Sequence, residues 1–187
     1  MFQTIKSLSL QRWPWLLLAA VALALDGTAL TLQHVFNVPP CNECIYIRLG
    51  VLGVGVAGLL GALAPRVPAF RLAGLAVWMG ALGWSLYRAN LLLNLERVVR
   101  EGGATGCARF KGFPSWLALD AWLPAMFEPR AMCGDVSWTF LGQSVTFWIW
   151  VALWCLALTA ALVLVAQKMT VFPAPAVDDS PGFRPER

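Results

Sequence analysis

The sequence has few charged residues and a single histidine. Asp, Glu, Lys and Arg together make up 13% of its 187 residues, whereas hydrophobic residues make up 59%. The mean hydropathy is +0.67. A composition this apolar lies outside the usual range of soluble domains. It argues against an ordinary soluble protein and predicts an integral protein of the lipid bilayer.

Two further absences narrow the function. The formal net charge is +4, but the chain has no basic stripe with interleaved aromatic residues, the usual mark of a nucleic-acid-binding surface. It also has no glycine-rich motif of the kind that binds a nucleotide. We therefore expect no nucleic-acid partner, and we attribute the scattered basic residues to membrane topology.

Four apolar segments are each long enough to cross a bilayer, which takes about 20 residues. They comprise residues 14–32, 45–63, 72–93 and 145–166. Two longer loops, at residues 33–44 and 94–144, follow the first and third segments. The pattern predicts an all-α membrane protein, a four-transmembrane-helix bundle whose single domain covers residues 1–167. The proline-rich tail at residues 168–187 is expected to be disordered.

Basic residues indicate how this bundle is oriented. One side carries Lys6, Arg12, Arg66, Arg71, Lys168, Arg184 and Arg187. On the opposite side, the loop at residues 33–44 has no Lys or Arg, although the loop at residues 94–144 has several. The positive-inside rule therefore predicts that both termini are cytoplasmic. A signal peptide cleaved near residues 22–24 is the alternative, but the apolar pattern resumes after Gly27, which favours a retained span.

The cysteines fall mainly on the non-cytoplasmic side. Four of the five lie in or beside the two longer loops, namely Cys41, Cys44, Cys107 and Cys133. Disulfides persist on that side of the membrane. Cys155 lies inside the fourth span, where we interpret it as a small hydrophobic residue. Zinc is a competing interpretation of four cysteines, but the second pair is too widely separated for a structural zinc motif, so we expect no metal.

The motif Cys41-Asn42-Glu43-Cys44 follows two prolines and immediately precedes the second span. Both sulfurs should therefore lie near a helix N-terminus, where free N–H groups and the helix dipole favour a thiolate. Arg48 lies four residues after Cys44 and so on the same helical face. A redox role is predicted, with exchange between this pair and the cysteines of the flexible second loop. The nearby cation and the membrane setting are consistent with a lipid-soluble electron acceptor such as a quinone.

Four further features each allow two interpretations. Asp26 is an acid inside the first span, so it either forms a structural hydrogen bond or handles protons. His34, at the outer end of that span, has the same two interpretations. The glycines of the second span favour close helix packing, with a flat ligand as the alternative. Residues 113–124 are bracketed by prolines and predict a short interfacial helix, or a loop packed over the bundle.

The ordered set of motifs resembles the disulfide bond formation protein B (DsbB) family of bacterial inner-membrane thiol:quinone oxidoreductases. The matching segments are Ala29-Leu30, Gln33-His34-Val35, Pro40-Cys41 to Cys44-Ile45-Tyr46 with Arg48, Phe113-Pro114 to Trp116-Leu117, Leu119-Asp120 with Trp122 and Pro124, and Trp138 with Phe140-Leu141-Gly142. They extend over nearly the whole chain except the tail. A Cys-x-x-Cys motif alone is a weak signal, whereas this ordered set is specific.

The resemblance implies a function in periplasmic disulfide formation. The protein would reoxidise a soluble thioredoxin-fold oxidase, DsbA, and pass the electrons to the membrane quinone pool, either ubiquinone or menaquinone. The reduced partner would attack a Cys107–Cys133 disulfide through Cys107, and Cys133 would then attack Cys41. The released Cys44 thiolate would engage the quinone beside Arg48, which stabilises negative charge there.

One departure from the family concerns the third span. The family has a histidine near its outer end that is implicated at the quinone, whereas this chain reads Asn90-Leu91-Leu92-Leu93-Asn94. The resemblance therefore identifies no residue of that helix that takes the place of the histidine at the quinone. The Asn42-Glu43 interior of the motif is also more polar than in some members.

Two other protein classes share part of this cysteine pattern. A vitamin K epoxide reductase-like protein also joins a membrane Cys-x-x-Cys to loop cysteines, but its motif is expected late in the chain rather than at Cys41. A non-catalytic four-span scaffold of the tetraspanin or claudin kind explains Cys107 and Cys133. That class leaves Cys44 and Arg48 unexplained.

Overall fold

The computed structural model describes residues 7–103, 113, 115–134, 136 and 138–168. Its four long helices are α2 (Arg12–His34), α3 (Asn42–Leu63), α4 (Pro68–Arg100) and α7 (Val145–Lys168). All four are long and apolar enough to cross a membrane. The predicted four-helix membrane fold is thus confirmed. Cys107 and residues 169–187, the predicted disordered tail, lie outside the described residues.

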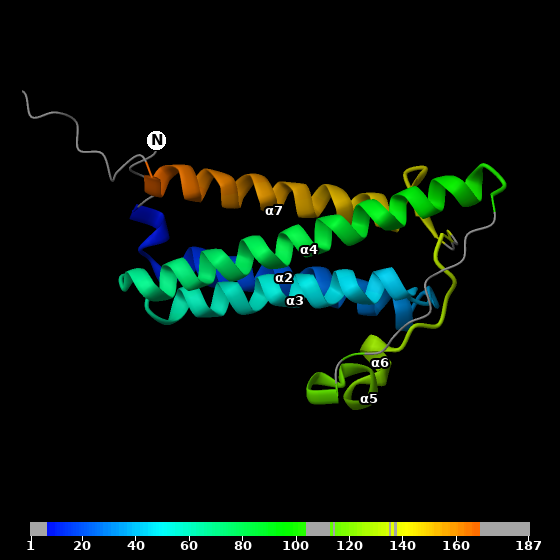
Figure 1. Cartoon of the computed structure of the whole chain (residues 1–187), viewed down its shortest axis with the longest axis horizontal. Coiled ribbons are helices and arrows are strands. Elements are labelled where there is room, and N and C mark those ends of the chain that lie inside the picture. Colours follow the sequence, from blue (N-terminus) through cyan, green and yellow to red (C-terminus); the bar gives the residue numbers. More distant parts are fainter. Residues whose placement is uncertain (1–6, 104–112, 114, 135, 137, 169–187) are drawn as a thin grey trace, which may run out of the picture.

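Helices α2, α3 and α4 pack against one another in sequence order, and α7 packs at one side of this group. Helix α3 packs between α2 and α4, while α7 packs along α4. Figure 1 shows α2, α3 and α4 close together, with α7 beside them. The start of α2 and the end of α7 lie at one end of the bundle, whereas α3 starts and α4 ends at the other (Figure 1). The two termini of the helical domain therefore share one end, opposite to the Cys-x-x-Cys motif.

Helix α4 is longer than the span predicted at residues 72–93. The helix begins at Pro68 and continues to Arg100, so that a proline occupies its first turn. Proline favours a helix start because its fixed φ angle suits the first turn and its missing N–H is not needed there. At the other end, the polar residues after Leu93 end the apolar pattern but not the helix, because Glu, Arg and Leu are good helix formers.

The expected short helix in residues 113–124 is a series of shorter turns. These are η1 (Ser115–Leu117), α5 (Leu119–Trp122) and α6 (Pro124–Phe127). Pro124 starts α6 and disfavours a helical conformation at Leu123, which separates α5 from α6. After this segment, the strands β1 (Thr139–Phe140) and β2 (Gln143–Ser144) form a small antiparallel ladder that leads into α7.

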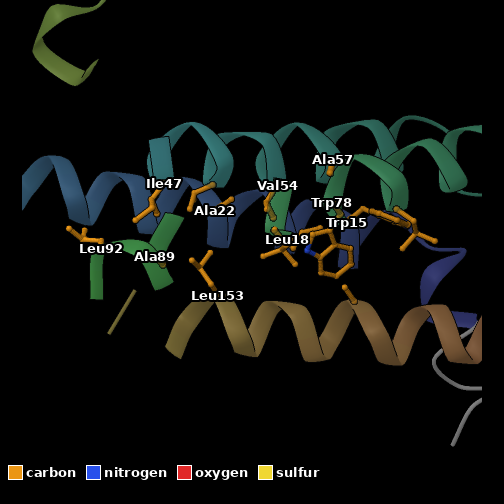
Figure 2. Close-up of a cluster of buried hydrophobic side chains, with 14 of the residues drawn as sticks. Trp15, Leu18, Ala22, Ile47, Val54, Ala57, Trp78, Ala89, Leu92 and Leu153 are labelled. Atoms are coloured by element: carbon orange, nitrogen blue, oxygen red, sulfur yellow. The ribbon is translucent and has the colours of Figure 1, made fainter. Parts of the chain in front are cut away.

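The core lies where the four helices face one another (Figure 2). It includes Trp15, Leu18, Ala22, Val54, Ala57, Leu75, Trp78, Leu82 and Leu153. Glycines of α3 allow this packing: a Cβ at Gly61 would collide with the Trp15 ring, and one at Gly50 would collide with the Ser85 hydroxyl of α4. Close helix packing therefore accounts for these glycines, and no space for a ligand remains against Gly50.

Candidate functional site

The Cys-x-x-Cys motif forms the first turn of α3. Cys41 is the N-cap residue in an extended conformation, and its sulfur accepts a hydrogen bond from the backbone N–H of Cys44 at 3.4 Å. The two sulfurs lie 2.9 Å apart. Pro39 and Pro40 keep the preceding chain out of a helical conformation, so the helix starts at the motif. The placement at a helix N-terminus agrees with the expectation from the sequence.

The two thiols differ in their surroundings. Cys41 is buried, with 5% of its surface exposed. The hydrogen bond between its thiol and the Cys44 sulfur raises the pKa of Cys41, and burial raises that pKa further. Although a helix N-terminus favours a thiolate, at Cys41 the neighbouring sulfur outweighs this effect. A raised pKa keeps the Cys41 thiol protonated, whereas either sulfur can be the donor in the hydrogen bond between the two.

Arg48 is buried one turn further along α3, and its guanidinium joins three elements. Its Nη1 donates to the Gln33 side-chain oxygen at 2.6 Å and to the Met126 carbonyl at 3.0 Å, while Nη2 donates to the Ala29 carbonyl at 3.2 Å. The guanidinium also interacts electrostatically with Cys44. These bonds fix a positive charge near the redox pair.

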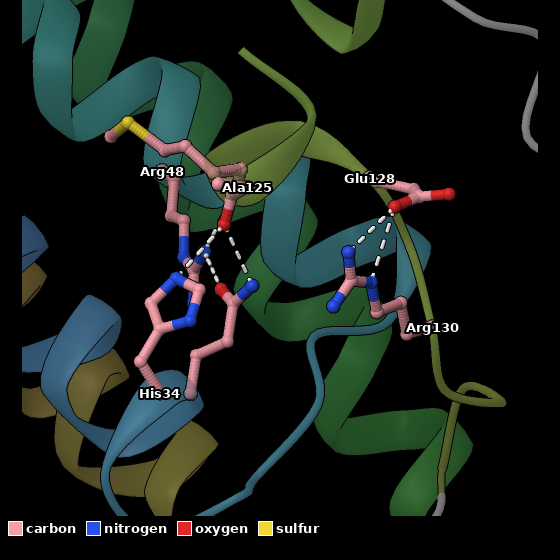
Figure 3. Close-up of polar contacts among 7 residues, drawn as sticks. His34, Arg48, Ala125, Glu128 and Arg130 are labelled. Carbon is pink, nitrogen blue, oxygen red and sulfur yellow. Dashed lines mark hydrogen bonds and ion pairs between the residues drawn. The ribbon is translucent and has the colours of Figure 1, made fainter.

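Gln33 and His34 hold α6 against the end of α2 (Figure 3). Gln33 donates to the Ala125 carbonyl at 2.8 Å, and a His34 ring nitrogen lies 3.1 Å from the same oxygen. Gln33 therefore bridges Arg48 and α6. His34 has a structural contact here and, among the described residues, does not line the cavity beside the cysteines.

A cavity of about 400 Å³ opens beside Cys44 at this end of the bundle. Its walls are mostly apolar, contributed by α2, α3, α4, α7 and the segment before α7. Representative lining residues are Leu25, Leu32, Ile47, Val51, Leu92, Trp138, Phe140, Trp148 and Leu153. This size and the apolar lining are typical of sites for small organic ligands and cofactors.

Several polar side chains also line the cavity, among them Asp26, Cys41, Cys44, Arg48 and Glu96. Asp26 is buried, and its Oδ2 atom has no hydrogen-bond partner within the described part of the chain. Glu96 is buried as well, and its carboxylate accepts a hydrogen bond from the Ser144 hydroxyl at 2.6 Å. The cavity wall thus combines two thiols, a cation and two carboxyl groups.

The segment that carries Cys133 is attached next to Cys41. The backbone N–H groups of Arg130 and Ala131 donate to the Pro40 carbonyl at 2.9 and 3.2 Å. Gly134 packs on α4, because a Cβ there would lie 2.7 Å from the Val99 side chain. Cys133 itself is buried and disulfide-bonded. Cys133 is therefore brought to the same end of the bundle as Cys41 and Cys44.

Several residues of this site were not predicted from the sequence. Gln33 was noted only as a neighbour of His34, and Glu96 was not singled out. Glu43 of the motif forms an ion pair with Arg88 of α4 at 3.3 Å, which was also missed. A signal existed for Arg88, because an ionisable residue inside a predicted span is a functional candidate by the same rule that identified Asp26.

Comparisons with known proteins identify the family. The family model described as "Disulfide bond formation protein DsbB" matches residues 11–163. A disulfide bond formation protein B of Psychromonas ingrahamii is 39% identical over 145 residues, 78% of this chain and 77% of that protein. Disulfide bond formation protein B 2 of Pseudomonas aeruginosa is 42% identical over 151 residues, 79% of this chain and 87% of that protein.

A third relative matches over a longer stretch of the chain. The disulfide bond formation protein B of Photobacterium profundum is 38% identical over 168 residues, 88% of this chain and 93% of that protein. These matches agree with the four membrane-spanning helices and with a redox-type pair of cysteines at the start of α3. The chain belongs to the disulfide bond formation protein B (DsbB) family of membrane proteins.

Proposed function

We propose that this protein reoxidises a periplasmic thioredoxin-fold oxidase of the DsbA type and passes two electrons to a membrane quinone. The reaction consumes one partner dithiol and one quinone, and yields one partner disulfide and one quinol. The protein lies in the bacterial inner membrane with both termini in the cytoplasm. This orientation is supported by the basic residues near the start of α2 and in the α3–α4 turn, at the end opposite to the cysteines.

The thiol exchange uses both cysteine pairs. A partner thiolate attacks the Cys107 sulfur of a Cys107–Cys133 disulfide, and Cys133 leaves as a thiolate. The second partner thiol displaces Cys107 and releases the partner as a disulfide. Cys133 attacks Cys41, so that Cys44 leaves as a thiolate, and Cys107 then displaces Cys41 from Cys133. The electrons thereby reach the Cys41–Cys44 dithiol.

The attachment of residues 130–131 to Pro40 supports this transfer. It keeps the chain that carries Cys133 next to the residue that precedes Cys41. Thiol-disulfide exchange needs the attacking sulfur to reach the disulfide from a suitable direction, so this proximity favours the step from Cys133 to Cys41. Among the described residues, Cys41, Cys44 and Cys155 are free and Cys133 is bonded, which supports Cys107 as its partner.

The cavity beside Cys44 fits a quinone. Its apolar walls suit an aromatic ring and an isoprenoid chain, and Arg48 presents a fixed cation to oxygen atoms that gain negative charge. When bound, the quinone supplies a two-electron, two-proton acceptor, whether it is ubiquinone or menaquinone. In this proposal Cys44 is the electron donor, and the apolar side chains of the cavity shield the site from water. The single observation that carries the proposal is this combination of Cys44, Arg48 and the cavity.

A single-turnover experiment tests the entry of electrons. Oxidised protein in detergent is mixed with a reduced DsbA-type partner in the absence of quinone, and free partner thiols are measured over time. Cys107→Ser should slow thiol loss at least about 100-fold, because the first disulfide is gone. Quinone binding should stay at the wild-type level, since the cavity lining is unchanged. Partner oxidation at the wild-type rate by Cys107→Ser would contradict the proposal.

Asp26 is the group that we propose for proton transfer at the quinone. It is buried, lines the cavity with Cys44 and Arg48, and has a carboxylate oxygen with no hydrogen-bond partner among the described residues. His34, the other sequence candidate, contacts the Ala125 carbonyl instead. A proton must reach each quinone oxygen during reduction, and a buried carboxyl group at the cavity wall can deliver it.

The variant Asp26→Asn keeps the size of the side chain but cannot transfer a proton. We expect quinone reduction by the pre-reduced protein to slow about 100-fold, measured as quinone absorbance in a stopped-flow instrument. His34→Gln is the comparison and should reduce quinone at nearly the wild-type rate. Equal rates for Asp26→Asn and the wild type would remove Asp26 from the proton pathway.

A further inference from the structure

Glu43 stands between the two redox cysteines in the sequence and is paired with a cation on another helix. Its side chain is 8% exposed, and Nη1 of Arg88 lies 3.3 Å from each carboxylate oxygen. Burial makes such a pair difficult to break, because either partner left alone would be an uncompensated charge. The pair links the first turn of α3 to the middle of α4.

Aromatic rings hold the guanidinium of Arg88 in place. Its central carbon lies 4.6 Å from the centre of the Tyr46 ring and 4.4 Å from the centre of the Trp84 ring. Tyr46 and Trp84 pack edge to face with their centroids 6.4 Å apart. Cations favour the faces of aromatic rings. Arg88 is therefore positioned by two rings as well as by Glu43, and its charge is fixed beside the motif.

The pair bears on the chemistry of the cysteines through charge. Reduction of a Cys41–Cys44 disulfide places negative charge on Cys44 whenever that sulfur is a thiolate. An unpaired carboxylate on the adjacent residue would oppose this charge, and in a buried setting the repulsion is only weakly screened. Arg88 compensates the carboxylate, so the motif can become reduced without two adjacent anions.

We propose that the Glu43–Arg88 ion pair is a positioning and charge-balancing element that sets the redox potential of the Cys41–Cys44 pair. The proposal rests on the redox role of these cysteines but not on the identity of the electron donor or acceptor. It assigns a function to the polar interior of the motif and to an arginine inside a membrane span. Among the described residues, neither Glu43 nor Arg88 lines the cavity beside Cys44.

The charge argument predicts shifts of opposite sign. Arg88→Met leaves the Glu43 carboxylate uncompensated, which destabilises the reduced motif and lowers its redox potential. Glu43→Gln leaves the Arg88 cation uncompensated, which stabilises a thiolate and raises the potential. The double variant removes both charges and should return close to the wild-type potential. A purely structural role of the pair would shift both single variants in the same direction.

The measurement uses the full-length chain in detergent with Cys107→Ser and Cys133→Ser, so that only Cys41 and Cys44 exchange. The protein is equilibrated with mixtures of reduced and oxidised glutathione, thiols are trapped by alkylation, and the reduced fraction is determined by mass spectrometry. Each single variant should change the equilibrium constant about tenfold, or about 30 mV, in the stated direction. Shifts of the same sign, or no shift in Glu43→Gln, would overturn the proposal.

Two controls keep the result interpretable. Arg88→Lys retains the charge and should stay within about threefold of wild type, even if Arg88→Met folds poorly. The pair of Glu128 and Arg130, with nitrogen and oxygen 2.9 Å apart, is exposed, so that solvent screens its charges, and it serves as the comparison. Glu128→Gln should leave the equilibrium constant unchanged. This equilibrium assay contains neither quinone nor partner. If the expected shifts were observed but the protein did not turn over quinone in a separate assay, only the proposed function would be contradicted.

Discussion

Cys44→Ser is expected to abolish quinone reduction, with a loss of at least about 1,000-fold in turnover. Cys44 lines the cavity together with Cys41 and Arg48, and in the proposed exchange it is the sulfur released when Cys133 attacks Cys41. A serine hydroxyl occupies nearly the same volume but cannot form a disulfide or give up electrons to a quinone. The measurement is quinone absorbance during turnover with a reduced DsbA-type partner.

The same variant should keep the fold. Cys44 makes no hydrogen bond to another helix in the described contacts, so helix content and the disulfide of Cys133 should match the wild type. Cys155→Ser is the matched control, because Cys155 is a free, exposed thiol on α7 and should not affect turnover. Wild-type turnover in Cys44→Ser would remove Cys44 from the mechanism.

Arg48→Ala should have the second largest effect, a loss of about 100-fold in kcat/KM for the quinone. The substitution removes the fixed cation beside Cys44, and charge stabilisation in a buried site commonly contributes this much. It also leaves the side-chain oxygen of Gln33 and the carbonyls of Met126 and Ala29 without their donor. The measurement is steady-state kinetics over a range of quinone concentrations.

Arg48→Lys separates charge from geometry. A lysine keeps the positive charge but lacks the planar group that bonds three acceptors at once, so we expect an intermediate loss. The control is Arg130→Ala, which removes an exposed arginine from the segment that carries Cys133. Its quinone kinetics should match the wild type. Unchanged kinetics in Arg48→Ala would show that the cation beside Cys44 does not assist the quinone.

Local sequence signals predicted much of the fold and part of the site. Segments of about 20 apolar residues predicted all four helices, because a bilayer imposes both length and composition on a span. Pro39 and Pro40 predicted that α3 starts at the motif, since proline prevents the preceding residues from being helical. The spacing of four residues placed Arg48 on the face of Cys44 for the same geometric reason.

Contacts between distant segments were beyond such signals. Arg88 and Glu43 belong to different helices, and nothing in the local pattern of either helix specifies how α4 is rotated against α3. The attachment of Ala131 to the Pro40 carbonyl is a backbone contact, which side-chain patterns do not encode. The bridging role of Gln33 could not be predicted either, because it depends on α6 packing against the end of α2.

The third span illustrates the difference between a motif and a cavity wall. Leu92 stands in the stretch where the resemblance led us to expect a histidine, and it lines the cavity as an apolar residue. One turn later, Glu96 places a buried carboxylate at the same wall. The sequence identified no residue of this helix that takes the place of the histidine, but α4 does contribute to the cavity that we assign to the quinone.

The most direct test of the central claim is a coupled assay of the purified protein. Reduced DsbA-type partner and ubiquinone are mixed with the protein in detergent, and partner thiols and quinone absorbance are followed in the same reaction. The account predicts that one quinone is consumed for every two partner thiols lost, and that Cys44→Ser abolishes both signals. If partner thiols and quinone remained unchanged with ubiquinone and with menaquinone, the assignment of this protein as a thiol:quinone oxidoreductase would be contradicted.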